Sequence, residues 1–186
     1  MKDAEKSFDQ EYFRERVGLE EKHFLEVLIW WNNFRPQKVV ELGCGLGHRV
    51  FAFNEINVDC EGCDLEFPII NTPYKEYNNK FKIGTITDSS YNDKYADLVI
   101  IYDVLEHLPM IEDVKKALKE AYRISKKYIM VSIPVIGDPN LKADKTHMIK
   151  KTMQWWEYQV ICAGFKLLPK PNNVPYREQM IWAEKI

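Results

Sequence analysis

Short apolar runs alternate with longer amphipathic stretches along the chain. Runs of strand length occupy five segments: 38–42, 58–64, 81–83, 96–102 and 128–133. The clearest of them, 96–102, holds four consecutive apolar residues from Leu98, which is typical of a parallel strand covered on both faces. Helices are predicted between and beside these runs, over five ranges: 8–34, 48–56, 74–79, 111–123 and 153–162.

The alternation ends near the C-terminus, where strands are predicted at 165–168 and 179–183 with no helix between them. We expect these two strands to pair antiparallel at one edge. Strands that alternate with helices are joined by right-handed crossovers and form a mostly parallel sheet. The predicted fold class is therefore α/β, a three-layer sandwich with a seven-stranded, mostly parallel sheet and an antiparallel edge pair.

Composition narrows the function classes. With 186 residues, the chain has the length of a single domain. Its 26 Lys+Arg and 28 Asp+Glu give a net charge of −2, which argues against a nucleic-acid partner. No apolar run approaches the ~20 residues that span a bilayer, and the acidic start does not resemble a signal peptide. We expect a cytoplasmic protein without a membrane partner.

The cysteines predict neither a disulfide framework nor a metal site. Cys60 and Cys63 form a Cys-x-x-Cys pair, but no second ligand pair stands at a spacing familiar from zinc sites. We interpret the thiols as structural and expect no metal.

Three glycines, Gly43, Gly45 and Gly47, follow the strand at 38–42 and precede the helix at 48–56. Glycine allows a sharp turn and lets a ligand approach the backbone, and the helix start can then receive an anionic group. A tight turn without a ligand is the alternative reading.

Two acids favour the ligand site. Glu41 stands in an apolar strand, where an unpaired carboxylate is costly, so a cationic ligand group or exposed amides should meet it. Asp64 ends the next strand, 21 positions after Gly43, close to the position of an acid that holds a ribose. The dinucleotide fingerprint needs a third glycine where His48 stands, which argues against a nucleotide-dependent oxidoreductase.

The segment Glu41-Leu-Gly-Cys-Gly-Leu-Gly47, the acid Asp64 and the segment Asp97-Leu-Val-Ile-Ile-Tyr-Asp-Val-Leu-Glu-His-Leu108 together resemble the class I S-adenosylmethionine-dependent methyltransferases, in their small-molecule branch. The resemblance runs from about Tyr12 to the C-terminus. It implies S-adenosylmethionine as cofactor, N-terminal helices in 1–36 that close over the cofactor site, and a core formed by 37–186.

Cofactor contacts follow from the same resemblance. It implies that Glu41 lies near the amino group of the methionine part, that Asp64 holds the ribose hydroxyls, and that Leu65 packs on the adenine. The other implied contacts come from seven residues: Gly43, Cys44, Gly45, Gly47, Ile86, Tyr102 and Tyr12. Thr85 stands where the family commonly has an aspartate, so Asp88 is the candidate acceptor for the adenine amino group.

Three residues are candidates for the chemistry. Methyl transfer is an in-line displacement that positioning can catalyse, and a general base is optional. His147, after the fifth strand, is the first candidate for a base, followed by His107 and Asp103 after the fourth strand. A structural role is the alternative for both histidines.

The predicted function is methyl transfer to an oxygen or nitrogen of a small-molecule or sugar-like acceptor. The alternatives are a non-catalytic binding subunit of the same fold and a methyltransferase that acts on a protein or an RNA. The sequence indicates neither the acceptor nor the oligomeric state.

Overall fold

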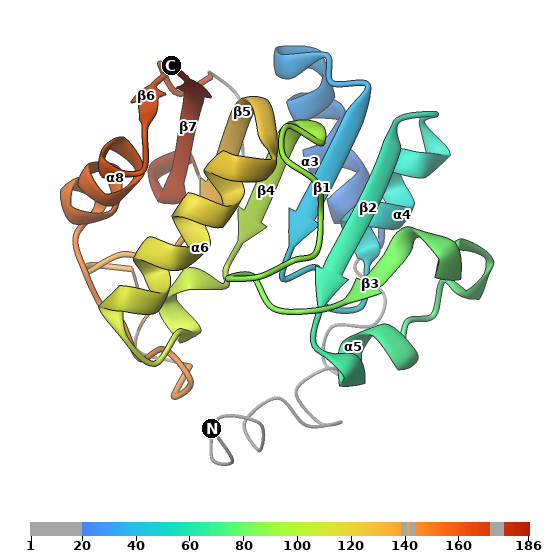
Figure 1. Ribbon diagram of the computed structural model, residues 1–186, viewed down its shortest axis with the longest axis horizontal. Helices are drawn as coiled ribbons and strands as arrows, with labels where there is room; N and C mark the ends of the chain where they lie inside the picture. The colour runs from blue at the N-terminus through green and yellow to red at the C-terminus, as the bar shows by residue number, and fades with distance from the viewer. Residues whose placement is uncertain (1–19, 139–140, 142–143, 172–176) are drawn as a thin grey trace.

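Seven strands form one sheet in the order β3-β2-β1-β4-β5-β7-β6 (Figure 1). The computed structural model describes residues 20–138, 141, 144–171 and 177–186. The strands are β1 (Lys38–Leu42), β2 (Asp59–Asp64), β3 (Phe81–Ile83), β4 (Ala96–Tyr102), β5 (Ser125–Ser132), β6 (Phe165–Leu167) and β7 (Met180–Lys185). The helices are α3 (Glu20–Phe34), α4 (His48–Glu55), α5 (Glu66–Ile70), α6 (Ile111–Ile124) and α8 (Met153–Cys162).

The first five strands are parallel, and β7 pairs antiparallel with both β5 and β6. The predicted fold class, including the antiparallel edge, is confirmed. The chain runs outward from β1 to β3 and then returns to β4 beside β1, so the strand order reverses between β1 and β4. Ligands of such sheets bind at the carboxyl ends of the strands at this point.

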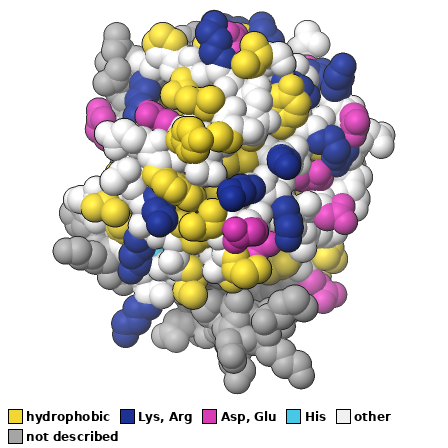
Figure 2. All heavy atoms as spheres, turned by 60° about the vertical axis from the view of Figure 1, so that its left-hand side comes forward, with side chains coloured by type: hydrophobic (Ala, Val, Ile, Leu, Met, Phe, Trp, Pro, Cys, Tyr) yellow, Lys and Arg dark blue, Asp and Glu magenta, His cyan; other side chains and the backbone are white. Residues whose placement is uncertain are grey.

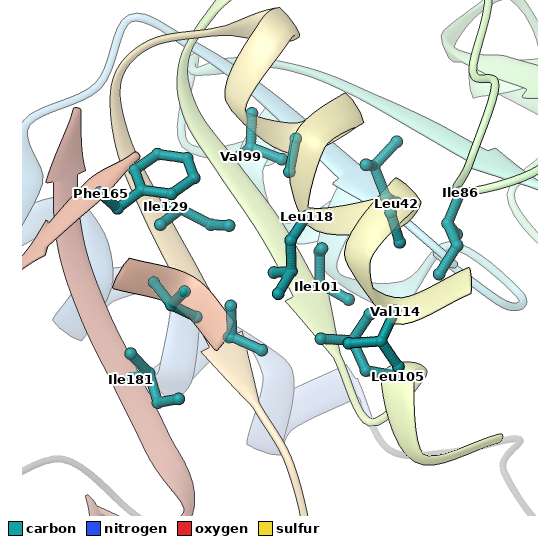
Figure 3. Close-up of a cluster of buried hydrophobic side chains, with 14 of the residues drawn as sticks. Leu42, Ile86, Val99, Ile101, Leu105, Val114, Leu118, Ile129, Phe165 and Ile181 are labelled. Carbon is teal, nitrogen blue, oxygen red and sulfur yellow. The ribbon is translucent and has the colours of Figure 1, made fainter. Parts of the chain in front are cut away.

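Helices cover both faces of the sheet. On one face, α6 and α8 enclose a buried cluster that includes Leu42, Ile101 and Leu118 (Figure 3). On the other face, α3 and α4 pack on Val39, Leu98 and Ile100. Helix α3 contributes the fully buried Val27 and Trp30 to this second cluster, so a helix that precedes residue 37 packs against the sheet.

Several short elements differ from the prediction. Residues 75–80 form a 3₁₀ helix, η1 (Lys75–Lys80), where a short helix over 74–79 was predicted. The short helix α5 and two further 3₁₀ turns, η2 (Leu105–His107) and η3 (Arg177–Gln179), were not predicted, because elements this short carry too little apolar periodicity. The N-terminal part of the helix predicted over 8–34 lies outside the described residues.

The cysteine pair cannot act as one site. Cys60 and Cys63 are three positions apart on β2, so they face opposite sides of the sheet and join different buried clusters. Burial raises the pKa of both thiols, as expected for structural cysteines.

The exposed lysines of α6, Lys115, Lys116 and Lys119, form a solvated helix face. Figure 2 shows Lys and Arg side chains interspersed with apolar and acidic ones on the side of the molecule that carries α8 and β6.

Candidate functional site

The turn between β1 and α4 requires its glycines. Gly43, Gly45 and Gly47 have φ angles of 76°, 54° and 86°, a region that residues with a Cβ rarely adopt. A Cβ on Gly43 would lie 2.4 Å from Val104 Cγ2, and one on Gly47 would lie 2.4 Å from the Phe81 ring. The glycine turn is therefore closely packed against Val104 and Phe81 at the carboxyl ends of the strands.

Asp64 lies at the end of β2, beside this turn. Its Oδ2 accepts a hydrogen bond from Gly45 N at 2.6 Å, and its Oδ1 accepts one from Leu65 N at 2.7 Å. Burial raises the pKa of the carboxyl, while these two N–H groups stabilise its ionised form. Leu65 is 46% exposed, so an apolar side chain lies uncovered next to the carboxylate. An acid beside an open apolar surface suits a ribose followed by a flat base.

Glu41 is almost completely buried at 1% exposure. Its Oε1 accepts a hydrogen bond from Arg49 Nη1 at 3.3 Å, and its Oε2 has no hydrogen-bond partner among the described residues. Burial raises the pKa of this carboxyl to about 7, against the attraction of the Arg49 guanidinium. From the sequence, a cationic ligand group or exposed amides were expected beside Glu41. Arg49 supplies part of this positive charge, and Glu41 Oε2 is left to accept a hydrogen bond from a further donor.

Arg49 connects Glu41 to helix α3. Its guanidinium also lies 3.2 Å from Glu26 Oε2 and 3.5 Å from the centre of the Tyr102 ring. Although burial opposes ionisation, the hydrogen bond from His23 and the charge of Arg49 lower the pKa of Glu26. Sequence reasoning missed this network. The sequence did contain one indication of a buried ion pair. A second acid, Glu26, stands between apolar residues in the predicted helix.

The other predicted cofactor residues occupy different surroundings. The Cys44 thiol packs against β2, where a Cβ on Gly62 would lie 2.6 Å from its sulfur, and the contact of its backbone with the cofactor stays a prediction. Ile86 is 8% exposed and joins the cluster under α6 (Figure 3). Asp88 is exposed. The Tyr102 hydroxyl donates to Glu26 Oε1 at 3.2 Å. Tyr12 lies outside the described residues.

The three candidates for the chemistry follow β4 and β5 in the chain. Asp103 follows β4 with a φ of 53°, and its Oδ1 accepts a hydrogen bond from Ser132 Oγ at 2.8 Å. Burial raises the pKa of its carboxyl. The ring centres of His107 and His147 lie 4.7 Å apart. Thr146, which precedes His147 and stands 39 positions after His107, lies within hydrogen-bond distance of the His107 ring. The two predicted histidine bases therefore lie side by side, whereas the side chain of Asp103 is bound to Ser132 at the end of β5.

Sequence comparison matches residues 40–128 to the family described as methyltransferase domain. The chain is also 23% identical over 170 residues to the uncharacterised methyltransferase YcgJ of Bacillus subtilis, covering 81% of this chain and 66% of YcgJ.

Solved structures share the fold. A SAM-dependent methyltransferase from Archaeoglobus fulgidus superposes with a TM-score of 0.74 at 20% identity, over 95% of this chain and all (100%) of that one. Magnesium protoporphyrin IX methyltransferase from Synechocystis, solved with bound SAM, superposes with a TM-score of 0.67 at 15% identity, over 92% of this chain and 81% of that one.

The domain match and the shared fold show that the chain has the class I methyltransferase fold, and they support S-adenosylmethionine as its cofactor. The chain spans about two thirds of the length of YcgJ, so the activity of the whole protein is a matter of proposal. Among the described helices, none has the length and apolar character needed to cross a bilayer.

Proposed function

We propose that this protein transfers the methyl group of S-adenosylmethionine to an oxygen or nitrogen of a small-molecule acceptor. The observation that carries the proposal is Glu41 Oε2, a buried carboxylate oxygen without a hydrogen-bond partner in the described part of the chain. It lies in the strand that leads into the glycine turn, where the methionine amino group is expected. An ammonium group there would satisfy this oxygen.

The remaining residues fit the cofactor in the same way. Asp64 offers a carboxylate to the ribose hydroxyls, Leu65 offers an exposed apolar surface to the adenine, and the turn at Gly43 and Gly45 offers backbone groups. When bound, the cofactor supplies an electrophilic methyl group. Its sulfonium carries a positive charge, which the buried carboxylates of Glu41 and Glu26 favour.

The acceptor side lies around the segment after β5. A surface hollow of about 390 Å³ adjoins His147 in sequence and is lined by six residues: Pro109, Ile111, Met148, Ile149, Lys150 and Lys151. Its size is that of a small-molecule pocket. Lys150 and Lys151 favour an acceptor with negative charge. His147, His107 or Asp103 would take the proton of an acidic acceptor.

A cytoplasmic location stays a prediction of the sequence.

Calorimetric titration with S-adenosylmethionine and with its demethylated product tests cofactor use. We expect both ligands to bind one site per chain, whereas NADH should not bind. Turnover is then measured as release of demethylated product over a panel of small hydroxyl and amine acceptors. Absence of cofactor binding would refute the proposal, and binding without turnover on any acceptor would support the non-catalytic alternative.

Cofactor affinity should depend on pH through Glu41. Because the pKa of this carboxyl is about 7, it is mostly neutral below that pH and becomes charged as the pH rises. The charged form attracts the amino group of the ligand, so affinity should increase by up to roughly tenfold between about pH 6 and about pH 8. Titration of the demethylated product at a series of pH values measures this.

The matched control is Glu41→Gln, which keeps the shape of the side chain. In this variant the increase over the same pH range should disappear, and affinity at the higher pH should fall. An increase of the same size in the variant would assign the titration to another group near the site, such as Asp64.

A further inference from the structure

Glu106, His107 and His147 bring three metal-binding atoms together at the carboxyl ends of β4 and β5. Glu106 and His107 belong to η2, and His147 belongs to the segment that follows β5. Glu106 Oε1 lies 3.9 Å from both His107 Nε2 and His147 Nε2, and ligand atoms from the three residues all lie within 4.8 Å of one another. The N–H groups of Met148 and Ile149 donate to the carbonyl oxygen of Glu106, which attaches the two segments to each other.

Glu106 is the least expected member of this group. Its side chain has no exposed surface, and neither carboxylate oxygen has a hydrogen-bond partner among the described residues. Buried polar groups are almost always satisfied, so an unpartnered carboxylate calls for a physical explanation. A cation held between the carboxylate and the imidazoles would provide one.

The hydrogen bonds behind the two rings present Nε2 as a ligand atom. Thr146 Oγ1 donates its single hydrogen to Asp144 Oδ1 at 2.5 Å, so it accepts from His107 Nδ1 at 2.9 Å. His147 Nδ1 lies 3.4 Å from the carbonyl oxygen of Leu141, which only accepts. Both rings therefore carry a hydrogen on Nδ1, and a neutral ring then has its lone pair on Nε2, on the side of Glu106. Metal-binding histidines are oriented by such contacts to the far nitrogen.

We propose that Glu106, His107 and His147 bind a divalent first-row transition ion such as Zn²⁺ or Mn²⁺. Two imidazoles and one carboxylate form the protein ligand set of catalytic zinc sites and of non-haem iron sites, which keep a coordination position open. Metal–ligand bonds of about 2.1 Å require neighbouring ligand atoms roughly 3.4 Å apart, so small side-chain rotations would close the present spacing. No metal was expected from the sequence.

The surroundings support a bound ion with an accessible position. Asp144 Oδ2 lies 3.8 Å from His147 Nε2, and its side chain is 27% exposed, so a second carboxylate stands on the solvent side of the group. Asp103, a candidate for the chemistry, lies on the same connection as Glu106. On the basis of the proposed function, the open position would hold a hydroxyl oxygen of the acceptor and lower its pKa.

Metal titration of the full chain tests the proposal. The chain carries Cys162→Ser as background, because Cys162 is an exposed free thiol that could bind metal on its own. After treatment with a chelator, the protein is titrated with Zn²⁺ and Mn²⁺ by calorimetry, and Co²⁺ is added to record its visible absorption bands. We expect one ion per chain and a cobalt spectrum without thiolate bands.

Variants assign the ligands. Glu106→Gln and His147→Gln should each weaken binding by roughly tenfold or more, while Glu112→Gln, an exposed acid on α6, should leave it unchanged. Circular dichroism in the absence of metal shows whether each variant folds. If one of the two ligand variants does not fold, the metal affinity of the other tests the assignment.

The proposal would be overturned if the folded parent protein bound none of the three ions, or if both ligand variants bound them as well as the parent. The first result would indicate a protonated Glu106. Titration of the same samples with S-adenosylmethionine separates the two proposals, because cofactor binding without metal binding rejects only the metal site. Metal binding without cofactor binding rejects only the proposed function.

Discussion

Replacing Arg49 with methionine is expected to lower the free energy of unfolding by about 3–5 kcal/mol. Arg49 is the cation between two acids, Glu26 and Glu41, whose side chains are both 1% exposed. Removing one partner of a buried ion pair leaves an uncompensated charge in a medium that solvates it poorly, whereas methionine keeps most of the apolar volume. Urea unfolding of the parent and of the variant at the same pH measures the change.

Two further variants separate this electrostatic cost from lost packing. The triple variant Arg49→Met, Glu26→Gln and Glu41→Gln removes all three charges together, so most of the lost stability should return. Lys115→Met, on the exposed face of α6, should change stability by no more than about 0.5 kcal/mol. If Arg49→Met cost no more than this surface substitution, the network would contribute nothing to the fold.

Replacing Asp64 with alanine is expected to weaken binding of S-adenosylmethionine by at least about 100-fold. A carboxylate that accepts two hydrogen bonds from a ribose contributes about 1.5–3 kcal/mol through each of them. In the free protein the same carboxylate accepts from Gly45 N and Leu65 N, so its loss also releases the turn that should contact the methionine part. Calorimetric titration measures the change in affinity.

Asp64→Asn serves as the conservative variant, because it keeps the size of the side chain and one acceptor oxygen. Its affinity should lie between those of the parent and Asp64→Ala. Asp93→Asn removes an exposed acid that pairs with Arg123, and it should bind the cofactor like the parent. Equal affinity in Asp64→Ala and the parent would contradict the assignment of the ribose to Asp64.

The strands, the glycine turn and Asp64 could be predicted because their signals are local. A buried parallel strand shows as an apolar run, as in β4, and a turn with positive φ angles shows as clustered glycines. The place of Asp64 follows from the lengths of one strand and one helix. The presence of an antiparallel edge was also predictable, because no helix separates the last two strands.

Other features depend on which segments pack together, and the tertiary structure alone decided them. The insertion of β7 between β5 and β6 depends on strand pairing, which has no local signature. Arg49 meets Glu26, 23 positions away, only because α3 packs on α4. His147 meets Glu106 because two strand ends are neighbours in the sheet.

The sequence by itself thus determined the fold class and the positions of the glycine turn and of Asp64, since these follow from short-range pattern. The tertiary structure decided how the buried charges are compensated and which histidine and carboxylate atoms converge. The physical reason is that a charge becomes costly only once folding removes it from water, and the groups that compensate it come from distant parts of the chain.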